Sequence, residues 1–416
     1  FVLLFLGVPI AMSLGLSAMG GILFLGGGST VTIAQRMFEG MNSFALLAIP
    51  LYTFAGFTMS KGGISKRLMD FCYSIVGHIY GGLAHVNVLS SMIFAGISGS
   101  AVADTAGVPG MFMPEMIRKG YSKNFTVAVT AISSTIGIII PPSIPMVVIA
   151  GICGISTGKL FLGGIIPGIL CGLAQMIVSY FLAKKEGVPK EPGHFTIGPV
   201  LHGLWESWPA LLMPIIIVGT ITMGIVSPTE AGVIAVVYGL FAGGIIYREL
   251  KWEDIKFAFA ETVRTSGRIF IVIGAAKLYT VMLTTAGFDK WVAKTMLGFS
   301  TNPTVILIMI LLIFFIVTMF MESIATLTLF MPILYPIALG VGINPIVLSV
   351  LITVVIGIGL VTPPVGMCIY VACDLMDTTV GEVFPTLVPF IAATFVCIAL
   401  MVAFPQLILL PTYLMA

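Results

Sequence analysis

Charged side chains are scarce in this 416-residue sequence. Only 9% of its residues are Asp, Glu, Lys or Arg, while 58% are hydrophobic, and the mean hydropathy is +1.15. A soluble protein carries about 25% charged residues, so this chain has too little polar surface to face water on all sides. The net charge of +2 gives no sign of a nucleic-acid partner, and we expect none.

Motifs for catalysis, nucleotide binding and metal binding are also missing. The six cysteines are scattered through apolar segments without a CxxC pair, which is typical of small buried hydrophobic side chains. The four histidines form no HExxH motif, and neither a GxSxG elbow nor a Walker loop is present. We therefore expect no enzyme activity and no catalytic residues. Energy for any transport would have to come from an ion gradient.

Long uncharged stretches make up most of the chain. A helix needs about 20 apolar residues to cross a hydrocarbon core of about 30 Å. The stretches that meet this length are 1–35, 40–60, 124–158, 160–183, 207–229, 295–321, 323–373 and 383–416. They predict an all-α polytopic membrane protein in contact with the lipid bilayer.

Basic clusters predict which loops face the cytoplasm, where Lys and Arg are enriched in membrane proteins. The clusters are KGGISKR (61–67), RKGYSKN (118–124), AKKEGVPK (183–190) and YRELKWEDIK (247–256). The segment 82–117 then starts and ends on the same side, and its middle reads GISGSAVADTAG. A second segment, 303–340, has MESIATLT at its middle. Both are predicted to be re-entrant helical hairpins with small and polar residues at the tip.

An internal repeat relates the two halves of the chain. A shift of 222 positions places Pro141-Pro142 on Pro363-Pro364, and it also matches Gly137 with Gly359 and Gly120 with Gly342. We assign 1–190 to the first repeat, 191–228 to a linking span and 229–416 to the second repeat. The odd crossing between them inverts the second copy, so the hairpins enter from opposite faces. Inverted repeats of this kind are typical of secondary transporters.

Each repeat contains a helix that proline interrupts in mid-membrane. The interruptions are TIGIIIPPSIPM within 124–158 and GIGLVTPPVGM within 345–376. Proline removes a backbone donor, and unpaired backbone survives at membrane depth only where it is buried in protein or lines a wet cavity. Free carbonyls at such a break can ligate a cation, and half-helix N-termini attract an anion.

The hairpin tips would add side-chain oxygens to each break. They are Ser98, Ser100 and Asp104 in the first tip, and Glu322, Ser323 and Thr326 in the second. Hard cations prefer oxygen ligands, so we predict two pseudo-symmetric Na⁺ sites with an anionic substrate between them.

Several of these features have a structural alternative. Proline in a membrane helix can be a simple kink, and Ser or Thr can bond their own backbone. Asp104 and Glu322 could cap or clamp the hairpins, and Glu230 could pin an outer loop. Lys277 could meet a substrate carboxylate, snorkel or pair with an acid. The basic and apolar stretches 65–77 and 251–268 are predicted to be interfacial helices.

Four motifs together resemble a known family. GISGSAVADTAGVPGMFMPEM, IIIPPSIPM, GIVSPTEAG and GLVTPPVGM are similar to the large membrane (M, permease) subunit of TRAP (tripartite ATP-independent periplasmic) transporters. The resemblance implies an elevator-type ion transporter of the bacterial inner (cytoplasmic) membrane. Its transport domain would contain the two hairpins and two broken helices. It also implies a separate small four-helix membrane subunit, a periplasmic substrate-binding protein, and Na⁺-coupled import of an organic acid such as a sialic acid or a C4-dicarboxylate.

By the same resemblance, each Na⁺ site lies at one tip and its proline pair. The predicted Na⁺ ligands are Ser98, Gly99, Ser100, Asp104, Ile140, Pro141, Glu322, Ser323, Thr326, Thr362, Pro363 and Gly366. The predicted substrate-binding residues are Ser100, Pro142, Ser143, Thr326 and Pro364. Apart from transported Na⁺, no cofactor is expected.

Two other functions compete with this interpretation. A stand-alone Na⁺/carboxylate symporter could share the inverted hairpins but would need no binding protein. A channel would need a continuous polar or charged lining, whereas the acids here gather at two tips.

Overall fold

The computed structural model of the protein describes residues 2–24, 30–188 and 196–415. Helices account for the regular structure of these residues, and no strand occurs among them. Seven of the described helices are long and apolar enough to cross a membrane. The prediction of an all-α polytopic membrane protein is confirmed. The predicted domain boundary at 190/191 lies outside the described residues.

The first half of the chain runs from α1 to α11. It opens with α1 (Val2–Phe5) and α2 (Ile10–Phe24) and ends with the long helix α11 (Thr157–Lys185). Between them lie α3 (Thr30–Met41), η1 (Phe44–Leu47), α4 (Ala48–Lys61), α5 (Ile64–Val76), α6 (Gly82–Ser98), α7 (Ala101–Ala106), α8 (Val108–Arg118), α9 (Lys123–Ser134), η2 (Thr135–Ile138) and α10 (Ile144–Cys153). Helices α6 to α8 form the first hairpin, and α9, η2 and α10 form the first broken helix.

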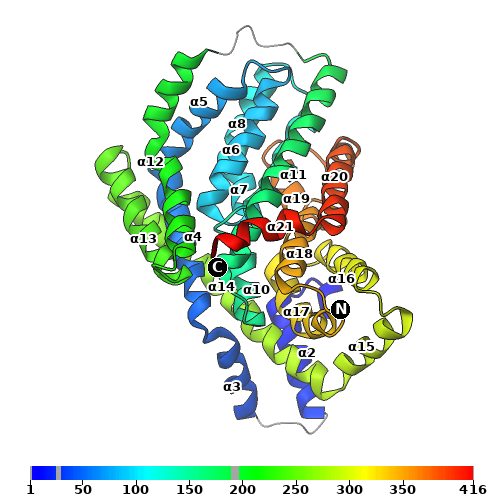
Figure 1. Ribbon diagram of the computed structural model, residues 1–416. Helices are drawn as coiled ribbons and strands as arrows, with labels where there is room; N and C mark the ends of the chain where they lie inside the picture. Colours follow the sequence, from blue (N-terminus) through cyan, green and yellow to red (C-terminus); the bar gives the residue numbers. More distant parts are fainter. Residues whose placement is uncertain (1, 25–29, 189–195, 416) are drawn as a thin grey trace.

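The helix α12 (Ile197–Thr222) links the halves, and the second half repeats the plan. Its elements are α13 (Pro228–Phe241), η3 (Ala242–Ile246), α14 (Trp252–Thr285), α15 (Phe288–Phe299), α16 (Pro303–Thr318), α17 (Ser323–Gly340), α18 (Pro345–Gly359), α19 (Met367–Asp374), α20 (Val380–Ala403), α21 (Gln406–Leu409) and η4 (Leu410–Met415). Helices α16 and α17 form the second hairpin, and α18 and α19 the second broken helix. In Figure 1 the first hairpin occupies the upper half of the molecule and the second the lower half.

Matching start signals precede the broken helices. Gly120 and Gly342 have φ values of +88° and +83°, a region that glycine enters without a steric penalty. Two residues later, Ser122 caps α9 and Asn344 caps α18, each through a side-chain oxygen that accepts from the backbone. The repeat therefore extends to turn geometry as well as sequence.

The two broken helices cross at the centre of the molecule, where their residues are buried on nearly all sides. At this crossing a Cβ added to Gly357 would lie 3.2 Å from the Cβ of Thr135. These positions are 222 residues apart, so each is the other's counterpart in the repeat. A residue that touches its own counterpart lies on the axis that relates two copies.

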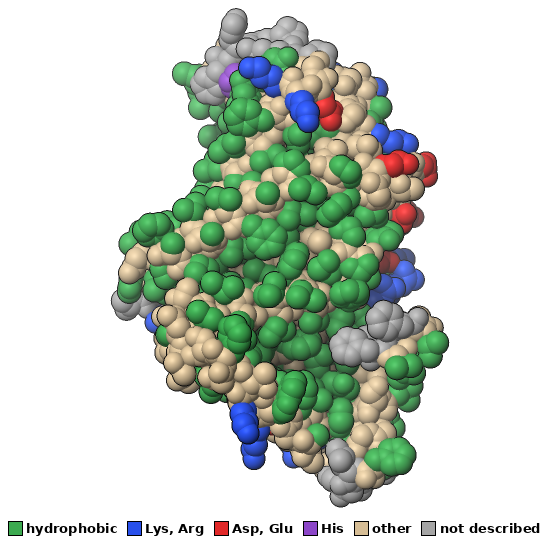
Figure 2. Space-filling model, turned by 90° about the vertical axis from the view of Figure 1, so that its right-hand side faces the viewer, with side chains coloured by type: hydrophobic (Ala, Val, Ile, Leu, Met, Phe, Trp, Pro, Cys, Tyr) green, Lys and Arg blue, Asp and Glu red, His purple; other side chains and the backbone are tan. Residues whose placement is uncertain are grey.

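Hydrophobic side chains cover the outside of the molecule. Figure 2 shows a face whose middle is largely hydrophobic, with Lys and Arg gathered near its upper and lower ends and along one edge. Large exposed apolar residues include Phe24, Trp205 and Phe299. Contiguous exposed apolar surface on this scale is a membrane-contacting surface.

One of the two predicted interfacial segments is part of a longer helix. The stretch 251–268 does not form a short helix that ends near Arg268, because α14 continues without a break to Thr285. No proline interrupts the sequence after Arg268, and the apolar run IFIVIGAA follows at once. The stretch 65–77, in contrast, does form most of a separate helix, α5.

Candidate functional site

Each hairpin tip rests directly on the break of its own repeat. In the first repeat, the backbone N–H of Ile144 donates to the carbonyl oxygen of Gly99 over 3.2 Å. In the second, the N–H of Val365 donates to the carbonyl oxygen of Met319 over 3.1 Å. The structure therefore brings the predicted tip and break residues together in both repeats.

The breaks expose unpaired carbonyl groups. No described residue donates a hydrogen bond to the carbonyl oxygens of Ile140, Pro141 or Pro142 in the first break. The same holds for Thr362 and Pro363 in the second. Both proline pairs, Pro141-Pro142 and Pro363-Pro364, contain a cis peptide bond. Buried carbonyl oxygens normally accept a hydrogen bond. Backbone oxygens that remain unpaired at membrane depth are therefore available to ligate a cation.

Asp104 is completely buried beside the first tip. The Ser98 hydroxyl donates a hydrogen bond to its Oδ1, whereas its Oδ2 has no partner among the described residues. A Cβ added to Gly137 would lie 1.9 Å from Oδ2, so only glycine leaves room for the carboxylate there. A buried carboxylate oxygen without a donor is costly unless a cation or proton occupies it.

Glu322 is used differently, as the N-cap of α17. Its Oε2 accepts from the backbone N–H groups of Ile324 and Ala325 at 3.0 and 3.3 Å, and its Oε1 accepts from the Ser323 hydroxyl at 2.9 Å. Capping satisfies N–H groups that the first turn of a helix leaves unpaired. Of the two tip acids, Glu322 holds the hairpin while Asp104 keeps a free oxygen.

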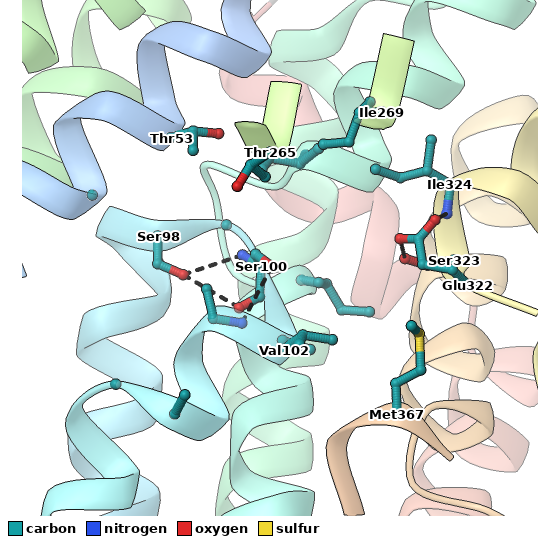
Figure 3. A pocket seen from close by; sticks show the side chains of 18 of the residues that line it. Thr53, Ser98, Ser100, Val102, Thr265, Ile269, Glu322, Ser323, Ile324 and Met367 are labelled. Carbon is teal, nitrogen blue, oxygen red and sulfur yellow. Dashed lines mark hydrogen bonds between the residues drawn. The ribbon is translucent and has the colours of Figure 1, made fainter. Parts of the chain in front are cut away.

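A cavity of about 650 Å³ is lined by both tips and by the helices α4 and α14. Ser98, Gly99 and Ser100 line it on the first hairpin, and Glu322 and Ser323 line it on the second. Figure 3 shows Ser98 and Ser100 on one side and Glu322 and Ser323 on the other, with Thr265 and Ile269 of α14 near them. A small organic molecule placed here would touch both tips at once.

The other predicted site residues are not part of the cavity lining. They are Asp104, Ile140, Pro141, Pro142, Ser143, Thr326, Thr362, Pro363, Pro364 and Gly366. Ser143 is buried and donates to the carbonyl oxygen of Ile138 over 2.5 Å, and Thr326 donates to that of Glu322 over 3.1 Å. Of the residues predicted to bind substrate, Ser100 is therefore the one that faces the cavity.

Two further polar residues named from the sequence lie elsewhere. Glu230 forms a capping box with Ser227 at the start of α13, where its Oε2 accepts from the Ser227 N–H over 2.6 Å. Lys277 is exposed on α14, does not line the cavity and makes no ion pair with a described residue. A Cβ added to Gly40 of α3 would lie 2.6 Å from the Lys277 Cβ, so the stem of this lysine packs against α3.

Sequence reasoning missed the wall of the cavity that faces the tips. Thr53 and Lys61 of α4 and Thr265 and Arg268 of α14 all line it. The sequence alone indicates Lys61 only as part of a cytoplasmic basic cluster and Arg268 only as the end of a predicted interfacial helix. The spacing of three residues places Thr265 and Arg268 on one helix face, but no pattern in the sequence shows that this face meets α4.

Comparison with known proteins identifies the family of the chain. The family described as "Tripartite ATP-independent periplasmic transporter, DctM component" matches residues 1–407. The chain belongs to this family. It is therefore a multi-pass membrane permease of a bacterial TRAP transporter, which is a transport function rather than a catalytic one.

Two curated members of the DctM family illustrate the likeness. The isethionate TRAP transporter permease protein DctMQ of Oleidesulfovibrio alaskensis is 37% identical over 94% of this chain, and the chain spans 61% of that protein's length. The sialic acid TRAP transporter large permease protein SiaM of Vibrio cholerae is 35% identical over 98% of this chain and 95% of its own length.

The fold of this DctM-family chain is similar to that of a distant transporter. The crystal structure of the Alcanivorax borkumensis YdaH transporter matches with a TM-score of 0.62 and 13% identity, covering 91% of this chain and 88% of that one. At this identity the likeness concerns the fold alone.

Proposed function

We propose that this permease imports an organic acid anion by secondary active transport coupled to Na⁺. The observation that carries the proposal is the first tip, where a fully buried carboxylate, Asp104, keeps one oxygen free next to a break with unpaired carbonyls. Oxygen ligands of this kind suit a hard cation. Among the described residues no group of three His, Cys, Asp or Glu side chains forms a site for a more strongly bound metal.

The solute is proposed to be an anion of the sialic acid or C4-dicarboxylate type. One relative is named for sialic acid, which carries a carboxylate, and another for isethionate, which carries a sulfonate. Both are small organic acids, and the cavity of about 650 Å³ has room for either.

The transport cycle is proposed to follow the elevator mechanism. The hairpins and broken helices form one buried unit around the crossing of α9, η2 and α18, whereas α4 and α14 form the opposite wall of the cavity. Movement of that unit against the wall would carry the tips and their ligands across the membrane. The cycle is proposed to take place in the bacterial inner membrane.

Two protein partners belong to the proposal. The family description names a tripartite periplasmic transporter, so we infer a small four-helix membrane subunit and a periplasmic substrate-binding protein. The competing function is a symporter that works without either partner.

Uptake by proteoliposomes tests the proposal. The permease is reconstituted with an inward Na⁺ gradient and a panel of organic acids, and the small subunit and the binding protein are each present or omitted. Uptake that requires all three proteins and Na⁺ is expected. Uptake by this chain alone would establish the stand-alone symporter instead, and uptake that K⁺ supports equally well would remove Na⁺ coupling.

A further inference from the structure

The cavity wall that faces the tips consists of one stripe from each of two helices. On α4 the lining residues are Thr53, Gly56, Phe57, Ser60 and Lys61, and on α14 they include Thr265, Arg268, Ile269 and Val272. Spacings of three and four residues put such side chains on one helix face. The wall is therefore a continuous surface built by the packing of α4 against α14.

Each stripe contributes one cation to this wall. Lys61 is the last residue of α4, and its Nζ lies 4.9 Å from the ring centroid of Phe257. Arg268 lies sixteen residues beyond Trp252, the start of α14, and makes no ion pair with a described residue. Arg264, one turn earlier, is in contrast paired with Glu261 at 2.6 Å and does not line the cavity.

Acidic groups do not balance these two cations inside the cavity. Among the described lining residues Glu322 is the sole acid, and its oxygens accept hydrogen bonds within its own hairpin. A charged side chain in a membrane-spanning helix is costly unless it pairs or faces a water-filled cavity. A wall of one charge sign also raises the local concentration of ligands of the opposite sign.

We propose that Arg268 on the α4–α14 wall binds the carboxylate or sulfonate group of the solute, and that Lys61 adds positive charge elsewhere on the same wall. The inference rests on the proposed function, because it names the residue that meets the transported anion. Arg268 supplies a planar fork that can bind two oxygens of such a group, and Lys61 supplies a point charge. The hairpin tips then face the opposite end of the solute.

This arrangement divides the site by charge. The tips offer oxygens, which suit cations, and the wall offers nitrogen donors, which suit the anion. Since the wall is opposite the tips, a solute anion bound to Arg268 bridges the two sides of the cavity in the state that the structure shows.

A reporter cysteine at Thr265 tests the local charge without any transport step. Thr265 lies one turn from Arg268 and lines the same cavity. In inside-out vesicles, the full-length Thr265→Cys protein is labelled with a negatively charged and a positively charged methanethiosulfonate, and labelling of the parent protein without the reporter is subtracted. The measured quantity is the ratio of the two labelling rates.

We expect Arg268→Gln to lower the ratio of anionic to cationic labelling about five-fold or more, which one unit charge at helical-turn distance produces even in a water-like medium. Lys61→Gln should lower it to a smaller extent. Arg268→Lys should keep the ratio near its original value. The matched control is Arg264→Gln, on the same helix but outside the cavity, and it should leave the ratio unchanged.

Protection from labelling tests binding itself. Excess isethionate, succinate or N-acetylneuraminate should slow the labelling of Thr265→Cys by an uncharged maleimide, and glycerol should not. Protection should be lost in Arg268→Gln and retained in Arg268→Lys. An unchanged labelling ratio in Arg268→Gln, or the absence of protection by every acid, would overturn the proposal.

The experiment also separates this inference from the proposed function. Protection that depends on Arg268, together with uptake that ignores Na⁺, would support the anion site and overturn Na⁺ coupling. Na⁺-dependent uptake by the Arg268→Gln protein with an unchanged apparent KM would overturn the anion site and leave the proposed function intact.

Discussion

The two hairpin tips place their polar residues at corresponding positions. Ser100 and Glu322 are counterparts 222 residues apart, and each caps the helix that returns from its tip. Asp104 and Thr326 are counterparts as well, one turn further along, and both are buried. Both tips thus have a capping residue followed, one turn later, by a residue with a side-chain oxygen. The charged residue is the later one in the first tip and the capping one in the second tip.

Substitution of Asp104 and substitution of Glu322 should therefore have different effects. Asp104→Asn removes the negative charge of the carboxylate whose Oδ2 lacks a partner among the described residues. An opposite charge near a bound cation contributes several kcal/mol in a partly buried site. We therefore expect the Na⁺ affinity measured by uptake to fall about 10-fold or more. Glu322→Gln should chiefly lower the free energy of unfolding, by about 1 kcal/mol, as the loss of a cap does. Na⁺ titration of uptake and thermal unfolding separate the two. Equal effects of both variants on Na⁺ affinity would contradict this difference.

The hydroxyl groups at the tips give a second test at this scale. Ser100→Ala and Thr326→Ala should both weaken the Na⁺ dependence of uptake, because each removes an oxygen near a break. Ser100 also lines the cavity, whereas Thr326 is buried and does not line it. We therefore expect Ser100→Ala alone to raise the apparent KM for the solute as well. If Na⁺ dependence were unchanged in both variants, these hydroxyls would not be ligands.

At the scale of elements, close contact between hairpin and break depends on small residues. A Cβ added to Gly359 would lie 2.7 Å from the Cβ of Thr318, at the end of α16. Gly359→Ala should push this hairpin away from its break, lower the free energy of unfolding by about 1–3 kcal/mol and reduce uptake. Gly219→Ala is the control, because nothing lies within 4 Å of its added Cβ in the helix α12. Thermal unfolding and uptake of the two variants give the comparison.

The proline pairs should matter more for transport than for folding. Pro142→Ala and Pro364→Ala restore a backbone N–H at each break, which favours a continuous helix. The carbonyl groups that are unpaired in the parent protein would then be hydrogen-bonded within the helix and no longer free to bind a ligand. We expect both variants to be inserted at normal levels and to lose most of their Na⁺-dependent uptake. Loss of insertion with normal uptake per inserted molecule would make the breaks purely structural.

These elements show which parts of the structure could be predicted from the sequence. The hairpins and the proline breaks were predictable because their punctuation is local: glycines, prolines and small polar residues that recur at one spacing. The wall of α4 and α14 was not predictable, because it depends on two helices that are remote in sequence and meet only in the fold. Arg268 reads from the sequence as one basic residue of an amphipathic stretch, and the apolar run that follows it does not show that α14 packs against α4.

The same reasoning explains why most of the predicted substrate residues do not line the cavity. Pro142, Ser143 and Pro364 belong to the breaks, so their sequence context identifies them as special. Whether a residue of a break faces the cavity depends on which side the hairpin covers. In the first break, the Ile144 N–H donates to the Gly99 carbonyl, and Ile144 lines the cavity while its neighbour Ser143 does not.

At the scale of the whole molecule, the inverted repeat predicts where the hairpin bases lie. Lys123 follows the first hairpin within a basic cluster, and Thr301 precedes the second. We expect a membrane-impermeant maleimide to label Lys123→Cys from the cytoplasmic side and Thr301→Cys from the opposite side. Both side chains are exposed, so each can react. Labelling of both from one side would contradict the inversion.

The contact between Thr135 and Gly357 has a consequence for the history and coupling of the two halves. When two identical chains associate in opposite orientations, a residue on the axis of the dimer contacts the same residue of the other chain. The molecule therefore has the geometry of an antiparallel homodimer whose two copies are joined by α12. Such a joint lies equally far from both tips. A side chain enlarged at this single point would disturb the two proposed ion sites together, and neither half could adjust without moving the other.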